Sequence, residues 1–101
     1  MVRWTRSGRI NGKKYLQAIQ WAKELVEWSN AKYSGKLTVY IDCFGEFGTI
    51  RFFRDYESLA EVEKRMETIL ADQEYLQRAA KAMEMDLFIE GSLTDTVMAS
   101  L

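Results

Sequence analysis

Histidine and proline are both absent from this sequence of 101 residues, which contains one cysteine. Without histidine the chain has no His-dependent catalytic triad, no histidine-ligated haem and no zinc or iron site built on imidazole. The single cysteine, Cys43, excludes an internal disulfide and lacks the companions of a metal site. We expect it to be a small buried hydrophobic residue. The sequence therefore predicts no cofactor and no metal.

Long hydrophobic runs and an excess of charge of one sign are also missing. No apolar run approaches the length of a transmembrane helix, and the first residues lack the apolar segment of a signal peptide. The formal net charge is −1, so we expect no nucleic-acid partner and no membrane surface. The missing membrane segment and signal peptide lead us to expect a cytoplasmic location. The length and the 48% hydrophobic content predict one folded domain over residues 1–101.

What the sequence does contain is a β-hairpin signal over residues 37–55. Two segments, Leu37–Phe44 and Thr49–Asp55, alternate apolar and polar residues as strands with two different faces do. The loop between them is Gly45-Glu46-Phe47-Gly48, whose glycines allow the positive φ angles of a tight or bulged hairpin. One face would carry Val39, Ile41, Ile50 and Phe52. The other would mix rings with charges: Tyr40, Asp42, Phe44, Arg51 and Phe53.

A strand and a long helix are expected before this hairpin. Val2–Arg9 predicts the strand, with Trp4 facing one side, and Lys13–Tyr33 repeats apolar residues with the 3.6-residue period of a helix. Trp21 and Trp28 lie on the flank of the apolar stripe. Two interpretations of this pair stay open, a contact with another subunit and packing over the helix edge against the chain's own sheet.

Two helical segments and a last strand are expected after the hairpin. Ser58 and Glu61 form the capping box S-x-x-E ahead of an apolar-periodic run. Asp72 resembles a second N-cap, which would interrupt the helix and restart it as Gln73–Met85. Leu87–Glu90 predicts the last strand, and the residues after it either extend that strand or cross onto a partner.

This βαββαβ order predicts an α+β, ferredoxin-like fold with a four-stranded antiparallel sheet in the order 4-1-3-2. Right-handed crossovers place both helical segments on one face of the sheet. The other face would carry exposed rings, each of which buries roughly 150–250 Å² when covered. We therefore expect a homodimer in which two sheets face each other.

Several residue patterns spread along the chain resemble a known family. They are Gly12-Lys13, Ala18-Ile19, Trp21-Ala22, Tyr56-x-Ser58-Leu59, Ala71-Asp72-x-Glu74-Tyr75 and Phe88-x-x-Gly91-Ser92. These patterns resemble the NIPSNAP-like and antibiotic-biosynthesis-monooxygenase-like proteins of the dimeric α/β-barrel superfamily. The resemblance implies two ferredoxin-like sheets paired into a barrel, with a pocket in each subunit. It implies no catalytic residue, because no motif matches residue by residue.

Three functions follow from these observations. The first is a homodimer that binds a small apolar or aromatic molecule, with cofactor-independent monooxygenation as its catalytic form. The second is a non-catalytic structural or regulatory dimer. The third is an RNA-recognition module, since Phe47-Gly48 and Ile50-x-Phe52 partly match an RNA-binding signature. The missing basic residue and the acidic pI of about 5.5 disfavour RNA.

The candidate ligand-binding residues are rings and charges on strand positions that the helices should not cover. Asp42 and Glu90 would form an acid/base pair if both faced a pocket. The alternative, which we favour, is ion pairing of these carboxylates with Arg3 or Arg51. The predicted ligand-binding set is Trp4, Tyr40, Asp42, Arg51, Phe53 and Phe88.

Overall fold

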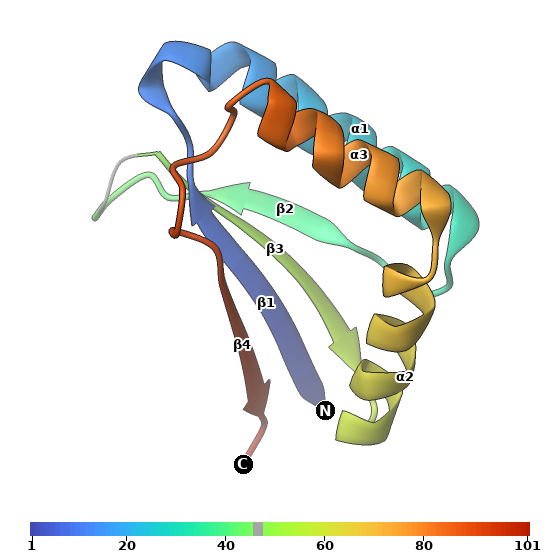
Figure 1. Ribbon diagram of the computed structural model, residues 1–101. Helices are drawn as coiled ribbons and strands as arrows, with labels where there is room; N and C mark the ends of the chain where they lie inside the picture. Colours follow the sequence, from blue (N-terminus) through green and yellow to red (C-terminus); the bar gives the residue numbers. More distant parts are fainter. Residues whose placement is uncertain (46–47) are drawn as a thin grey trace.

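The computed structural model describes residues 1–45 and 48–101 and contains one antiparallel sheet in the order β2-β3-β1-β4 (Figure 1). Its strands are β1 (Val2–Arg9), β2 (Thr38–Ile41), β3 (Thr49–Tyr56) and β4 (Thr94–Ala99). The predicted α+β, ferredoxin-like class and the strand order 4-1-3-2 are confirmed.

The helices lie on one face of the sheet (Figure 1). A short 3-10 turn, Gly12–Lys14, leads into α1 (Tyr15–Lys32), and α2 (Leu59–Leu70) and α3 (Gln73–Glu84) follow β3. Both predicted caps are confirmed. Ser58 Oγ accepts the Glu61 N–H at 3.3 Å, and Asp72 Oδ1 accepts the N–H of the first turn of α3. No helix within the described residues is long and apolar enough to cross a membrane.

The core lies between the sheet and α1. In the observed pairing of β2 with β3, Val39 is opposite Phe52 and Ile41 is opposite Ile50. These four residues therefore share one face of the sheet, as expected, and it is the face that the helices cover. Small residues of α1, Ala18 and Ala22, are fully buried and let the helix approach the sheet closely. The other buried apolar residues are Trp4, Ile10, Leu25, Leu37, Val62, Ala82 and Leu87.

The predicted last strand at Leu87–Glu90 is wrong. Leu87 is fully buried and its N–H donates to Ala82 O, while Phe88 forms only an isolated bridge to Ile10. These residues are apolar because they close the end of the core beneath the helices. The strand lies further on at β4, in the segment that was expected either to extend the strand or to reach a partner. β4 exposes every residue, so its pairing with β1 leaves little hydrophobic pattern in the sequence.

The prediction of a buried Cys43 is also wrong. β2 ends at Ile41, two residues before it, and Cys43 lies in the turn that follows, where it is exposed. Gly45 and Gly48 both have positive φ, +93° and +88°, as the hairpin required. Glu46 and Phe47, the centre of the predicted loop and part of the partial RNA-binding signature, lie outside the described residues.

Replacing the cap Ser58 with Ala tests the start of α2. The variant should lose about 1 kcal/mol of unfolding free energy, because the Glu61 N–H loses its side-chain acceptor at the helix N-terminus. Urea unfolding of the two proteins measures the difference. The variant Ser58→Asn, which keeps a side-chain acceptor at the cap, serves as the control and should keep the stability of the parent protein. Equal stabilities of Ser58→Ala and the parent protein would show that the cap contributes nothing.

Candidate functional site

A cavity of about 580 Å³ lies between the helix-covered face of the sheet and the helices. Residues of β1, β3, all three helices and the segment before β4 line it. Its walls are mostly apolar, and the rim carries exposed Leu70, Met83, Ile89 and Leu93. All three tryptophans of the chain reach it, and the aromatic lining is Trp4, Trp21, Trp28, Phe52, Tyr75 and Phe88. Binding pockets for small molecules typically combine such walls with a few polar groups.

One polar group in the cavity is centred on Arg6 of β1. Its guanidinium forms a two-point ion pair with Asp95 of β4, with nitrogen–oxygen distances of 2.7 and 2.8 Å, and donates to Tyr75 Oη at 2.8 Å. Trp4 Nε1 donates to the same carboxylate at 3.3 Å. The hydrogen bond from Arg6 lowers the pKa of Asp95, against the opposing effect of burial. Arg6 therefore links β1 to β4 and to α3, and its positive charge is balanced by the carboxylate of Asp95.

The second polar group is Arg54 of β3, which lies opposite Trp4 in the β1–β3 register. Arg54 is 2% exposed, and its Nη2 donates to Oγ of Ser29 on α1 at 2.8 Å. Ser29 is also buried. Both residues line the cavity, whose other charged lining residues are Arg6, Asp86 and Glu90.

Helix α3 is held above this cavity by side chains of α1. Trp21 Nε1 donates to Arg78 O at 3.0 Å, and Trp28 Nε1 donates to Glu74 Oε2 at 2.9 Å. Lys32 Nζ lies 3.0 Å from Glu74 Oε1, so one carboxylate joins two positions of α1. These links hold the first half of α3 against α1.

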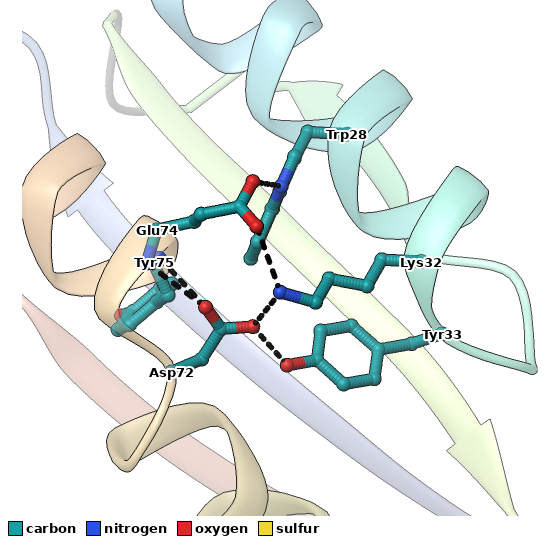
Figure 2. Close-up of polar contacts among 6 residues, drawn as sticks. All are labelled: Trp28, Lys32, Tyr33, Asp72, Glu74 and Tyr75. Atoms are coloured by element: carbon teal, nitrogen blue, oxygen red, sulfur yellow. Dashed lines mark hydrogen bonds and ion pairs between the residues drawn. The ribbon is translucent and has the colours of Figure 1, made fainter.

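The end of this series is the cap of α3, shown in Figure 2. Asp72 Oδ1 accepts the N–H groups of Glu74 and Tyr75 at 2.9 and 3.4 Å. Asp72 Oδ2 pairs with Lys32 Nζ at 2.8 Å and accepts the Tyr33 hydroxyl. The hydrogen bonds from Lys32 and then Tyr33 lower the pKa of Asp72 to about 2. Because Asp72 begins α3, this junction also positions Tyr75, whose hydroxyl reaches Arg6 in the cavity.

The structure does not bring the six predicted ligand-binding residues together. Four of them lie on or beside the uncovered sheet face, where the rings of Tyr40 and Phe53 are 5.2 Å apart and Arg51 pairs with Asp42 at 2.9 Å. That ion pair, favoured over an acid/base role, is present, and it lowers the pKa of Asp42. Trp4 lines the cavity on the opposite face, together with Phe88, because β1 places Trp4 on the helix side.

Both tryptophans of α1 make contacts within the chain, and Trp21 packs over the helix edge against the sheet as one of the two interpretations expects. The ring of Trp21 contacts Phe52 and Phe88 edge-on at 6.3 and 5.5 Å, and Trp28 contacts Tyr33 at 6.0 Å. Both tryptophans line the cavity. The cavity residues that sequence reasoning missed are Arg6, Ser29, Arg54 and Tyr75. It also missed Asp95, which pairs with Arg6 from β4. The sequence does point to Arg54, because in an alternating strand it falls on the same face as Ile50 and Phe52, which are buried.

No protein-family model matches the sequence, and no match was found among curated proteins. Solved structures do match. An uncharacterised NIPSNAP domain protein from Burkholderia xenovorans superposes with a TM-score of 0.81 at 14% identity, covering 100% of this chain and 95% of the other. A NIPSNAP family protein from Agrobacterium tumefaciens gives 0.80 at 18% identity, covering 99% and 92%. A protein described as an antibiotic biosynthesis monooxygenase gives 0.71 at 13% identity, covering 100% and 99%.

The resemblance inferred from the residue patterns is thus confirmed at the level of the fold. Structural neighbours include both NIPSNAP and antibiotic biosynthesis monooxygenase proteins, and each alignment spans essentially the whole chain. Identities this low establish a shared fold and leave the chemistry to the residues of the site. Among the described residues, no cluster of three His, Cys, Asp or Glu side chains could hold a metal ion.

The charge on Asp72 should make stability depend on pH in the acid range. The folded-state pKa of about 2 lies below the value of about 3.9 for an unfolded aspartate. The stabilisation is therefore complete above about pH 4 and is lost as the pH falls through about 2. Asp72→Asn keeps a side-chain acceptor for the cap but removes the charge, so its urea midpoint should fall less between pH 4 and pH 2.

Glu63→Gln, which removes an exposed carboxylate from α2, is the control and should keep the acid dependence of the parent protein. Identical pH profiles for Asp72→Asn and the parent would show that the junction does not couple α1 to α3 through this charge.

Proposed function

We propose that this protein binds a small, largely apolar aromatic molecule in the cavity between its sheet and its helices. The observation that carries the proposal is the lining of the cavity, in which six aromatic side chains surround about 580 Å³ with only a few polar groups. Flat rings favour offset or edge-on contacts with other rings, which a set of this kind offers to a planar ligand. The Arg6–Asp95–Tyr75 group would orient a polar substituent of that ligand.

A second candidate function is oxygenation of the bound molecule without a cofactor. The neighbour described as an antibiotic biosynthesis monooxygenase supports it. In such a reaction the substrate itself supplies the electrons: 1-naphthol and O₂ would give 1,4-naphthoquinone and water, one oxygen atom entering the ring and the other leaving as water. Oxygen uptake with 1-naphthol separates this candidate from a non-catalytic binding or regulatory protein, for which no uptake above the protein-free rate is expected.

We also propose that the protein is a homodimer joined through the uncovered sheet face. That face carries Tyr40, which is 62% exposed, next to Phe53, and Met98 of β4, which is 52% exposed. Arg3 lies over the Phe53 ring at 4.5 Å and pairs with Asp55 at 2.8 Å. A mixed surface of rings and paired charges, with no helix over it, is typical of a subunit interface.

Binding in the cavity is tested with 2-naphthamide, a planar neutral probe, by calorimetry and thermal shift. The parent protein should bind it and melt at a higher temperature in its presence. Ala79→Phe, which puts a ring into the cavity from α3, should weaken binding by about tenfold or more, which corresponds to about 1.4 kcal/mol. Ala80→Phe, at the exposed neighbouring position, is the matched control and should bind as the parent does. Equal affinity of both variants would contradict the proposed site.

The dimer is tested by light scattering at micromolar concentration, where the parent protein should have twice the mass of the chain. Phe53→Asp should dissociate it, because the interface would have to bury an unpaired charge. Leu16→Asp, an equivalent change at an exposed position of α1, should leave the mass unchanged. A monomeric parent protein, or a Phe53→Asp variant that remains fully dimeric, would contradict this interface.

A further inference from the structure

Arg54 is the most unusual charged residue of the molecule. It is 2% exposed and lines both the cavity and a second, more polar hollow. Its only hydrogen bond to the described residues runs from Nη2 to the neutral hydroxyl of Ser29, and its Nε–H has no partner among them. An arginine stays charged in proteins, and buried charges are normally paired with an opposite charge.

Three other arginines of the same sheet show the expected pairing. In Arg3, Arg6 and Arg51 the Nε and Nη2 groups both donate to the two oxygens of one carboxylate, at distances between 2.7 and 3.1 Å. Those carboxylates belong to Asp55, Asp95 and Asp42. All three arginines are more exposed than Arg54. The most deeply buried guanidinium of the sheet therefore has no carboxylate partner within the described chain, although desolvation makes one most valuable there.

We propose that Arg54 binds the carboxylate of an aromatic ligand in the cavity, so that the natural ligand is an aromatic monocarboxylic acid. This inference rests on the proposed function of the cavity and adds the charge of the ligand. The Nε–H of Arg54 would donate to one carboxylate oxygen. Ser29 Oγ already accepts from Nη2, so its own hydrogen is available to the other oxygen. Charge-assisted pairs of this kind are the strongest hydrogen bonds in proteins.

The remaining cationic group of the cavity does not compete for this carboxylate. Arg6 is neutralised by the two-point contact with Asp95, and an added anion would be repelled by that carboxylate. Arg54 also lines a second, more polar hollow, but Ser29 lines only the cavity. Nε and Nη2 lie on the same edge of a guanidinium, so the unpartnered N–H lies on the Ser29 side of the group. The Nε atom is buried, so a ligand oxygen reaches it only when the side chain shifts.

The first experiment uses the unmodified protein and two probes of the same shape, 2-naphthoate and 2-naphthamide, compared by calorimetry at neutral pH. The carboxylate should bind at least about tenfold more tightly than the amide, because a charge-assisted pair is stronger than a hydrogen bond to a neutral amide. Equal affinities would overturn the role of Arg54 and leave the proposed cavity intact. Binding of neither probe would instead contradict the proposed function itself.

Substitutions then locate the preference. Arg54→Met replaces the guanidinium with an unbranched apolar side chain and should abolish the preference for the carboxylate while the amide still binds. Lys23→Met removes one exposed positive charge from α1, outside the cavity, and should keep the preference. If Arg54→Met does not fold, Ser29→Ala takes its place and should reduce the preference several-fold without changing affinity for the amide. An unchanged preference in the folded variant would overturn the proposal.

Discussion

The position of α3 depends on α1 more than on the sheet. Three side chains of α1, Trp21, Trp28 and Lys32, reach the cap and the first half of α3. The main contacts of α3 are accordingly with the other two helices. A helix held by other helices does not have to pack directly against the strands to be stable. The space beneath it is the cavity, so the same contacts that complete the helix layer also create the candidate site.

Arg6 of β1 and Arg54 of β3 both line the cavity from neighbouring strands, but their charged groups have different partners. Arg6 has a carboxylate, a phenol and an indole ring around it, whereas Arg54 has one hydroxyl. The first arrangement is a structural tie between β1, β4 and α3, since every charge in it is compensated. The second costs stability in the absence of an anion, because desolvation of a cation is only partly offset by a neutral partner. Such a cost is typical of a site that binds something.

The two faces of the sheet therefore have different proposed roles. The helix-covered face carries the cavity, and the uncovered face carries paired charges with exposed rings between them. Proteins with the same fold but identities below 20% include NIPSNAP proteins and a protein described as a monooxygenase. The fold by itself does not choose between these activities. The cavity residues of this chain therefore have to be tested directly.

Local signals in the sequence determined most of the elements and the strand order. Period-two alternation set the faces of β1, β2 and β3, and the caps Ser58 and Asp72 set the starts of α2 and α3, because each depends only on residues a few positions apart. Only the tertiary structure placed β4, whose exposed residues carry no hydrophobic pattern, and only it showed that Leu87 and Phe88 close the core. It also decided the site. Whether Trp4 or Arg54 lines a cavity depends on how far α3 stands from the sheet, and that distance is set by contacts between residues about 40 to 57 positions apart.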